Sequence, residues 1–184
     1  MAWLQKLSLS RCRWILGVLG VLLAIAVGWG ATAWRAHRID AYLREALLYQ
    51  ATAIAQNVDP ALAKALTFTP ADKGTPAYER LRAQFTAYGQ IIPNHGIYTM
   101  ALRDGQILFG PENYPENDPM ASPPGTVYQE PGPEDFDVLQ TGRVYTIGPV
   151  SDEYGTFVSA LAPVLDPQTD HVIMAVGIDI LAED

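Results

Sequence analysis

Hydrophobic and polar positions divide the chain into an uncharged N-terminal segment, a helical stretch and a region of short strands. The 21 residues from Trp14 to Trp34 include no charged side chain, and a helix of that length spans a hydrocarbon core of about 30 Å. Residues 35–58 continue with inward positions at spacings of three and four, which predicts an amphipathic stalk helix. These positions are Ile39, Leu43, Ala46, Leu47, Gln50, Ile54 and Val58.

The N-terminal flank indicates which way the apolar segment crosses a membrane. Lys6, Arg11 and Arg13 precede it without an acidic residue, so the positive-inside tendency places residues 1–13 in the cytoplasm. The expected arrangement is a single-pass protein of a bacterial inner membrane. Trp14–Trp34 then contacts lipid, and residues 35–184 form a periplasmic domain.

A cleaved signal peptide is the alternative for the same segment. Ala31-Thr32-Ala33 fits a cleavage site, and Gly28 and Gly30 weaken the helix before it. The long apolar run and the unbroken helical pattern after it favour an anchor. In both cases the bulk of the chain is exported.

Cap and turn residues mark the helices of the exported part. Asp59-Pro60 and Thr75-Pro76 each pair a capping side chain with proline at the first helical position. They predict helices that run to Leu66 and to about Tyr88, where Gly89 stops the second one. Residues 133–140 predict one or two further helical turns, ended by Gly142.

Short strands with turn signals follow from residue 96 onward. The predicted strands are 96–102, 107–109, 144–147, 156–164 and 171–180, and seven prolines make residues 110–133 irregular apart from a short edge strand at 126–128. Asp104-Gly105 and Asp166–Asp170 predict hairpin turns. The pattern indicates an α+β fold, with a five-stranded antiparallel meander after a helical layer.

Charge and cysteine content narrow the function classes. The chain has a net charge of −8, and all twenty acidic residues lie after position 35, where only eight basic ones remain. Such an acidic domain is a poor partner for nucleic acid, which needs clustered lysine and arginine. The single cysteine, Cys12, lies in the cytoplasmic flank, so the exported part has no disulfide, cysteine-ligated metal or cysteine nucleophile.

Four short motifs occur in order along the exported part. They are Ile97-Tyr98-Thr99-Met100 with Arg103–Ile107, Pro124–Tyr128, Gly148-Pro149 with Asp152–Ser159, and Pro163-Val164 with Val176–Ile180. Together they resemble the Cache domain, a PAS-like extracytoplasmic sensor of bacterial signal-transduction receptors. The resemblance covers roughly residues 35–180.

The resemblance implies a fold and a role. The fold is a single Cache unit, in which a central antiparallel sheet is flanked by a long N-terminal helix and carries a ligand pocket on one face. The role is sensing by a histidine kinase, a chemoreceptor or a cyclic-dinucleotide enzyme. The sequence ends at Asp184 without an output module, and we expect it to be a fragment of a longer receptor.

Five residues are the candidate ligand contacts: Tyr98, Arg103, Tyr145, Asp152 and Tyr154. The resemblance places Tyr98 and Tyr145 on neighbouring strands as ring walls with hydroxyl tips. Asp152 suits an amine, and Arg103 or Arg143 suits a carboxylate. The competing interpretations are a polar turn around Asp152, core packing of the tyrosines and solvated arginines.

Other polar residues have plainer interpretations. Asp179 interrupts an apolar strand, and a structural hydrogen bond to the preceding loop is expected there. The acidic clusters 112–118 and 130–137 lack a calcium-loop pattern and are expected to be solvated. His37, His95 and His171 have no metal-ligand spacing and are expected at the surface. No serine has a histidine at motif spacing, so neither catalysis nor a cofactor is expected.

The sequence therefore predicts a membrane-bound, ligand-sensing receptor domain that signals through its N-terminal helix. Its expected ligand is an amino acid, an amine or an organic acid. The apolar residues of the stalk exceed what one packed face needs, so a homodimer is also expected. The alternative is a secreted binding or assembly protein released after Ala33.

Overall fold

The computed structural model describes residues 2–182, with side chains from Trp14 onward. The chain forms two compact units, residues 1–43 and 44–184. Helix α1 (Ala2–Gln56) runs unbroken through the first unit into the second. The side chains of the predicted basic flank, residues 1–13, lie outside the described part.

The side chains of residues 14–43 are exposed throughout. Within the described residues, α1 is the one helix long and apolar enough to cross a membrane, although a signal sequence shares these properties. Its buried face begins later than the stalk pattern predicts. Leu47, Ala51 and Ile54 are buried, whereas Ile39 and Leu43 are exposed. The helix predicted for residues 35–58 is present as far as Gln56, and its buried residues begin within the second unit, which starts at Arg44.

The predicted caps begin the short helices of the second unit. Asp59 accepts a hydrogen bond from Ala61 N (2.8 Å) at the start of α2 (Pro60–Ala65), and Thr75 accepts one from Tyr78 N (3.3 Å) at α3 (Pro76–Gly89). A 3₁₀ turn, η1 (Pro70–Asp72), lies between them. Helix α4 (Pro133–Thr141) ends where Gly142 adopts a φ of 74°, a conformation that favours glycine.

The described sheet has five antiparallel strands. They are β1 (Gly96–Arg103), β2 (Gln106–Phe109), β3 (Tyr145–Asp152), β4 (Gly155–Leu165) and β5 (Val172–Leu181). Their order is β2-β1-β5-β4-β3, so the sequential meander predicted from sequence is wrong. The last strand enters between β1 and β4, which puts the first and last strands of the region side by side. The predicted α+β class, with one long helix before a PAS-like five-stranded sheet, is confirmed.

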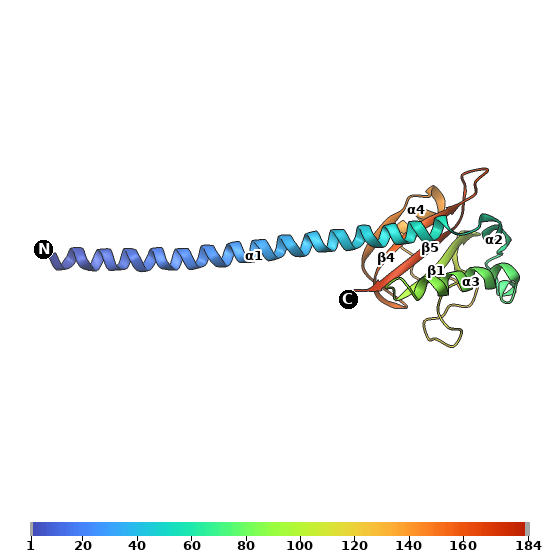
Figure 1. Ribbon diagram of the computed structural model, residues 1–184, viewed down its shortest axis with the longest axis horizontal. Helices are drawn as coiled ribbons and strands as arrows, with labels where there is room; N and C mark the ends of the chain where they lie inside the picture. The colour runs from blue at the N-terminus through green and yellow to red at the C-terminus, as the bar shows by residue number, and fades with distance from the viewer. Residues whose placement is uncertain (1, 183–184) are drawn as a thin grey trace. The chain divides into compact units, whose positions relative to one another are not determined.

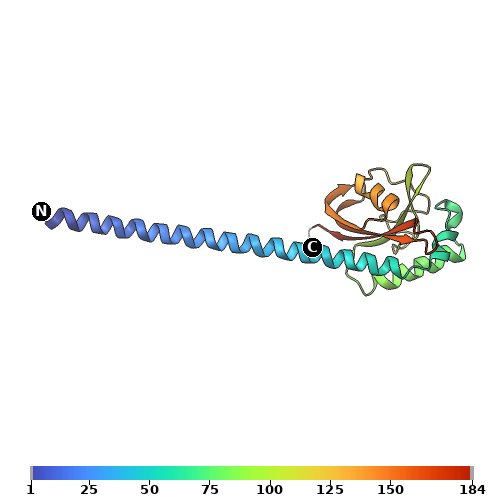
Figure 2. The same cartoon turned by 90° about the horizontal axis from the view of Figure 1, so that it is seen from above.

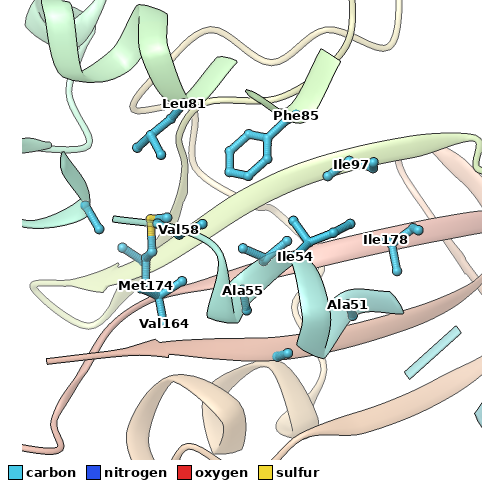
Figure 3. Close-up of a cluster of buried hydrophobic side chains, with 14 of the residues drawn as sticks. Ala51, Ile54, Ala55, Val58, Leu81, Phe85, Ile97, Val164, Met174 and Ile178 are labelled. Atoms are coloured by element: carbon cyan, nitrogen blue, oxygen red, sulfur yellow. The ribbon is translucent and has the colours of Figure 1, made fainter. Parts of the chain in front are cut away.

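One face of the sheet packs against the helices. Ile97, Val176 and Ile178 project from the strands and are fully buried against the end of α1 and against Leu81 and Phe85 of α3. Figure 3 shows side chains of this core, among them Ile54, Leu81, Phe85, Ile97 and Ile178. Burial of apolar area contributes about 25 cal/mol per Å², and this face holds the larger of the two clusters of buried hydrophobic residues.

The other face is covered differently. Helix α4 lies on this side of the sheet, opposite α3 and the end of α1 (Figures 1 and 2). Val138 and Leu139 of α4 pack on Met100, Leu161 and neighbouring strand residues. The proline-rich segment 110–132 returns along β2, where Val127 forms an isolated bridge with Leu108 in place of the predicted edge strand. The rest of this face is left for a cavity.

Candidate ligand-binding site

A two-lobed pocket lies on the α4 side of the sheet. The first lobe, of about 40 Å³, has Asp179 in its wall and is called the Asp179 lobe. The second, of about 90 Å³, is lined by Tyr145 of β3 and is called the Tyr145 lobe. Tyr98, Tyr128, Asp152 and Phe157 line both lobes, so the two are parts of one site.

Aromatic rings form most of the wall of the Asp179 lobe. Phe109 of β2 is central, because Tyr98, Tyr128 and Tyr154 surround it at centroid distances of 5.8, 5.4 and 5.6 Å. The Tyr98 and Tyr154 contacts are edge-to-face, the geometry that aromatic quadrupoles favour. This packing fixes the rings before any ligand arrives.

Two glycines in the sheet make room for rings. Gly177 of β5 lies opposite Tyr98, and a Cβ there would overlap the Tyr98 ring. Gly96 of β1 lies opposite Asp179, and a Cβ there would lie 2.5 Å from the Tyr114 hydroxyl. The rings therefore lie directly over the backbone of β1 and β5, beside Asp179.

Tyrosine hydroxyls donate to aspartates around the pocket. Tyr98 donates to Asp179 (3.1 Å), and Tyr128 donates to Asp152 (2.8 Å). Tyr145 donates to Asp135, which also accepts from Gly132 N at the start of α4. Burial is the main cause that raises the pKa of the Tyr98, Tyr128 and Tyr145 hydroxyls, and the neighbouring carboxylates raise it further.

Two carboxyl groups of the Asp179 lobe are held in poorly solvated positions. Burial raises the pKa of Asp179 to about 7, although hydrogen bonds from Ser159 and Tyr98 act against it. Burial also raises the pKa of Glu112 to about 7, against the hydrogen bond from Ser122 N. Both groups therefore titrate near neutral pH.

The turn between β3 and β4 ties the pocket to the proline-rich segment. Asp152 accepts hydrogen bonds from Tyr154 N (2.8 Å) and Gly155 N (3.2 Å), which closes the turn. The Tyr154 and Ser122 hydroxyls lie 2.8 Å apart. Asp152 is thus a turn residue and a pocket residue at once, so the two interpretations of it are compatible.

The structure brings four of the five predicted residues together. Tyr98, Tyr145, Asp152 and Tyr154 all line the pocket. Tyr98 and Tyr145 do so from strands that are not neighbours, since β5 and β4 separate β1 from β3. The predicted adjacency is therefore wrong, and the rings meet because side chains on the same sheet face converge on the cavity.

The two predicted arginines lie elsewhere. Arg103 alternates with Tyr98 along β1 onto the helix-packed face, where its guanidinium lies 5.1 Å from the centre of the Phe68 ring. Arg143 is exposed and lies 3.5 Å from Asp137 at the surface. Neither lines a lobe, so we leave both out of the candidate site.

Two carboxylates lie in surroundings that differ from those predicted from the sequence. Glu112 was expected in a solvated loop, but it is 5% exposed because the proline-rich segment folds back over it. Asp179 was expected to bond the preceding loop, but its side chain pairs with Tyr98 on the adjacent strand. The unusual position of Asp179 was visible in the sequence, because an acidic residue there interrupts an apolar strand. His95 is also not fully at the surface, since it packs on Phe157.

Among solved structures, the chain is similar to sensory domains of the Campylobacter jejuni chemoreceptor Tlp3. The complex with 4-methylisoleucine matches with a TM-score of 0.39 and 14% identity over 76% of this chain and 60% of that one. The isoleucine complex gives 0.39 and 13% over 80% and 62%, and the L-valine complex gives 0.38 and 14% over the same shares.

These matches are chemoreceptor ligand-binding domains, the class of domain that the sequence resembles. This chain covers less than two thirds of their length. At such low identity and TM-score, the similarity says nothing about the ligand of this protein. No family model and no curated protein matches the chain.

Proposed function

We propose that the protein is a membrane-anchored, extracytoplasmic sensor domain that binds a small molecule in the two-lobed pocket. The pocket itself carries the proposal, because preformed aromatic cavities with a few converging polar groups are typical ligand sites. The apolar part of α1 supports the anchor, and residues 35–184 would then lie outside the membrane.

A hydrogen bond connects the pocket strands to α1 and supports signalling through that helix. Arg44 Nη2 donates to the carbonyl oxygen of Gly148 (2.7 Å), which lies at the irregularity of β3 between Ile147 and Val150. Ile147 and Val150 line the Tyr145 lobe. Ligand binding that shifts β3 would therefore move an anchoring point of α1, which is how a ligand biases a two-state element.

The test is a binding screen on the full chain in lipid nanodiscs. Amino acids, organic acids and amines would be tested by the shift in the domain's thermal unfolding midpoint, and hydrogen exchange would follow residues 44–56 of α1. We expect one class to stabilise the domain and to change exchange in α1. A ligand that binds without changing exchange in α1 would contradict signalling, and no stabilising ligand in any class would contradict sensing.

The secreted alternative predicts a different mature chain. Mass spectrometry of the exported protein would find a first residue of Trp34 after cleavage, and an intact N-terminus if the anchor is retained. We expect the intact form.

We also propose that the receptor is a homodimer. Ile39, Tyr42, Leu43 and Tyr49 are exposed on α1, which leaves apolar surface for a second copy. Analytical ultracentrifugation of the chain, with and without ligand, would show a dimer if this is right and a monomer if it is wrong.

A further inference from the structure

The charge of the pocket is all of one sign. Five carboxyl residues line the two lobes, and no lysine, arginine or histidine is among the described lining residues. The five are Glu112, Glu130, Asp135, Asp152 and Asp179. A ligand carboxylate would enter this pocket without a cationic partner, whereas a positive charge would be stabilised.

Three arginines of the domain have contacts outside the two lobes. Arg103 lies over the Phe68 ring, and Arg143 faces Asp137. Arg82 donates to the Tyr114 carbonyl oxygen (2.8 Å) and lies 3.6 Å from Glu116. None of the three lines a lobe, although the charge of Arg82 acts on Glu112 of the Asp179 lobe. A carboxylate clamp would therefore require breaking an existing contact.

Asp179 differs from the other aspartates in its hydrogen-bond donors. Asp72, which is buried outside the pocket, accepts hydrogen bonds from the backbone N–H groups of Thr67 and Phe68. Asp152 and Asp135 likewise hold backbone N–H groups. The described donors to the Asp179 carboxylate are the Tyr98 and Ser159 hydroxyls alone. A carboxylate with so few fixed donors is suited to receive N–H groups from a ligand.

Rings surround the same position. Tyr98, Tyr114, Tyr154 and Phe157 line the Asp179 lobe together with the carboxylate. The negative faces of aromatic rings attract a cation within about 6 Å of the ring centre. The adjoining Tyr145 lobe adds the aliphatic side chains of Ile147, Val150 and Leu161, which suit a short hydrocarbon group.

We propose that the pocket binds a small primary ammonium ion without a carboxylate, its nitrogen against Asp179 in the ring cage and its hydrocarbon part in the Tyr145 lobe. The inference rests on the proposed function, that the pocket is a ligand site. It narrows the ligand to amines and excludes free amino acids and organic acids. The small volume of the Asp179 lobe leaves room for a primary ammonium group and not for one with further substituents on the nitrogen.

Three compounds with the same branched hydrocarbon separate the ligand classes. Isobutylamine has the ammonium alone, L-valine adds a carboxylate on the adjacent carbon, and isovalerate has a carboxylate in place of the ammonium. Calorimetric titration of the full chain in nanodiscs at pH 8 would compare them, with propylamine and benzylamine as amines of other shape. We expect an amine to bind at least ~10-fold more tightly than L-valine, and isovalerate not to bind, because a carboxylate meets only like charge.

The variant Asp179→Asn tests the position of the nitrogen. The amide keeps the shape and still accepts from Tyr98, but it has no charge. We expect at least ~10-fold weaker amine binding and reduced discrimination against L-valine. The matched control is Asp137→Asn on α4, since Asp137 pairs with Arg143 and lines neither lobe. It should bind like the original chain, and circular dichroism should show both variants folded.

The outcomes separate this inference from the proposed function. If L-valine or isovalerate binds as tightly as the amines, the domain is a sensor but the ammonium assignment is wrong. If Asp179→Asn binds amines like the original chain, the assignment is also wrong. If no compound of any class binds, both the assignment and the sensor proposal fail.

Discussion

The two faces of the sheet are built from alternating residues of the same strands and have opposite properties. On the helix-packed face, Val176 and Ile178 of β5 are fully buried among aliphatic and aromatic side chains. On the pocket face, the residues between and after them are Gly177 and Asp179, a missing side chain and a carboxylate. Strand alternation therefore lets one strand stabilise the fold and shape the pocket.

The difference separates the face that packs the core from the face that carries the candidate site. The helix-packed face is filled, whereas the pocket face gives up packing for a cavity and holds carboxylates where water is scarce. Substitutions on the helix-packed face should change stability with little effect on ligand binding. Substitutions on the pocket face should change ligand binding more than stability.

The largest effect is expected from emptying the helix-packed core. Phe85 of α3 is fully buried (Figure 3), and Phe85→Ala should lower the free energy of unfolding by about 3–5 kcal/mol because it leaves a cavity. Urea denaturation of the full chain, followed by circular dichroism, would measure this. Ile91→Ala is the control, since Ile91 is 76% exposed, and it should change stability by less than about 0.5 kcal/mol. A small effect at Phe85 would mean that this face does not carry the stability.

The next effect is a pH dependence that belongs to the pocket face. The raised pKa values of Asp179 and Glu112, about 7 in both cases, mean that the folded state favours their protonated forms. Their stability contribution is therefore full below their unfolded values, near pH 4, and is lost as pH rises through about 7. Burial is the largest cause of both raised pKa values. The neighbours that also act on them are Tyr98, Ser159, Asp152 and Asp135 around Asp179, and Ser122, Arg82 and Asp118 around Glu112.

Thermal unfolding of the ligand-free chain between pH 4.5 and 8 would test this dependence. Asp179→Asn should be more stable than the original chain by about 1–3 kcal/mol at pH 8, because it removes a poorly solvated charge. The gap should close on acidification, as the Asp179 carboxyl becomes neutral. A gap that does not change with pH would contradict the assignment of the effect to Asp179.

Neighbouring residues of β5 give the sharpest contrast between the faces. In Gly177→Ala the new methyl group overlaps the Tyr98 ring, so we expect about 1–2 kcal/mol of lost stability together with a large loss of amine affinity. In Val176→Ala, on the other face, we expect a similar loss of stability and unchanged affinity. Calorimetric titration and urea denaturation of both variants would decide. Equal affinity losses would show that the faces are not independent.

Local features of the fold were predictable from sequence, and long-range ones were not. Asp59-Pro60, Thr75-Pro76 and Asp104-Gly105 act within a few residues, and each begins a helix or forms a turn where predicted. The strand order depends on β1 pairing with β5, about eighty residues later. Cap and turn residues carry no information about such a pairing, so a sequential meander was the natural expectation.

The lining of the candidate site was predictable as far as residue type reveals it. Tyrosines and a turn aspartate near the strands pointed to Tyr98, Tyr145, Asp152 and Tyr154. Glu112 was missed because its burial depends on how the proline-rich segment folds back, which composition does not show. The position of Arg103 on the opposite face was predictable, since it lies an odd number of residues from Tyr98 on one strand.

The smallest effect is expected at that arginine. Arg103 contributes a cation–π contact with Phe68 on the helix-packed face, and such contacts are worth about 0.5–1 kcal/mol at partly exposed sites. Arg103→Ala should therefore lower the free energy of unfolding by less than about 1 kcal/mol and leave the affinity for amines and for L-valine unchanged. Arg103→Gln keeps most of the side-chain length, so its free energy of unfolding should lie between those of the original chain and Arg103→Ala. If Arg103→Ala instead weakened L-valine binding selectively, this arginine would reach a ligand carboxylate in the bound state. The separation of the two faces, and with it the assignment of the pocket to carboxylate-free amines, would then be wrong.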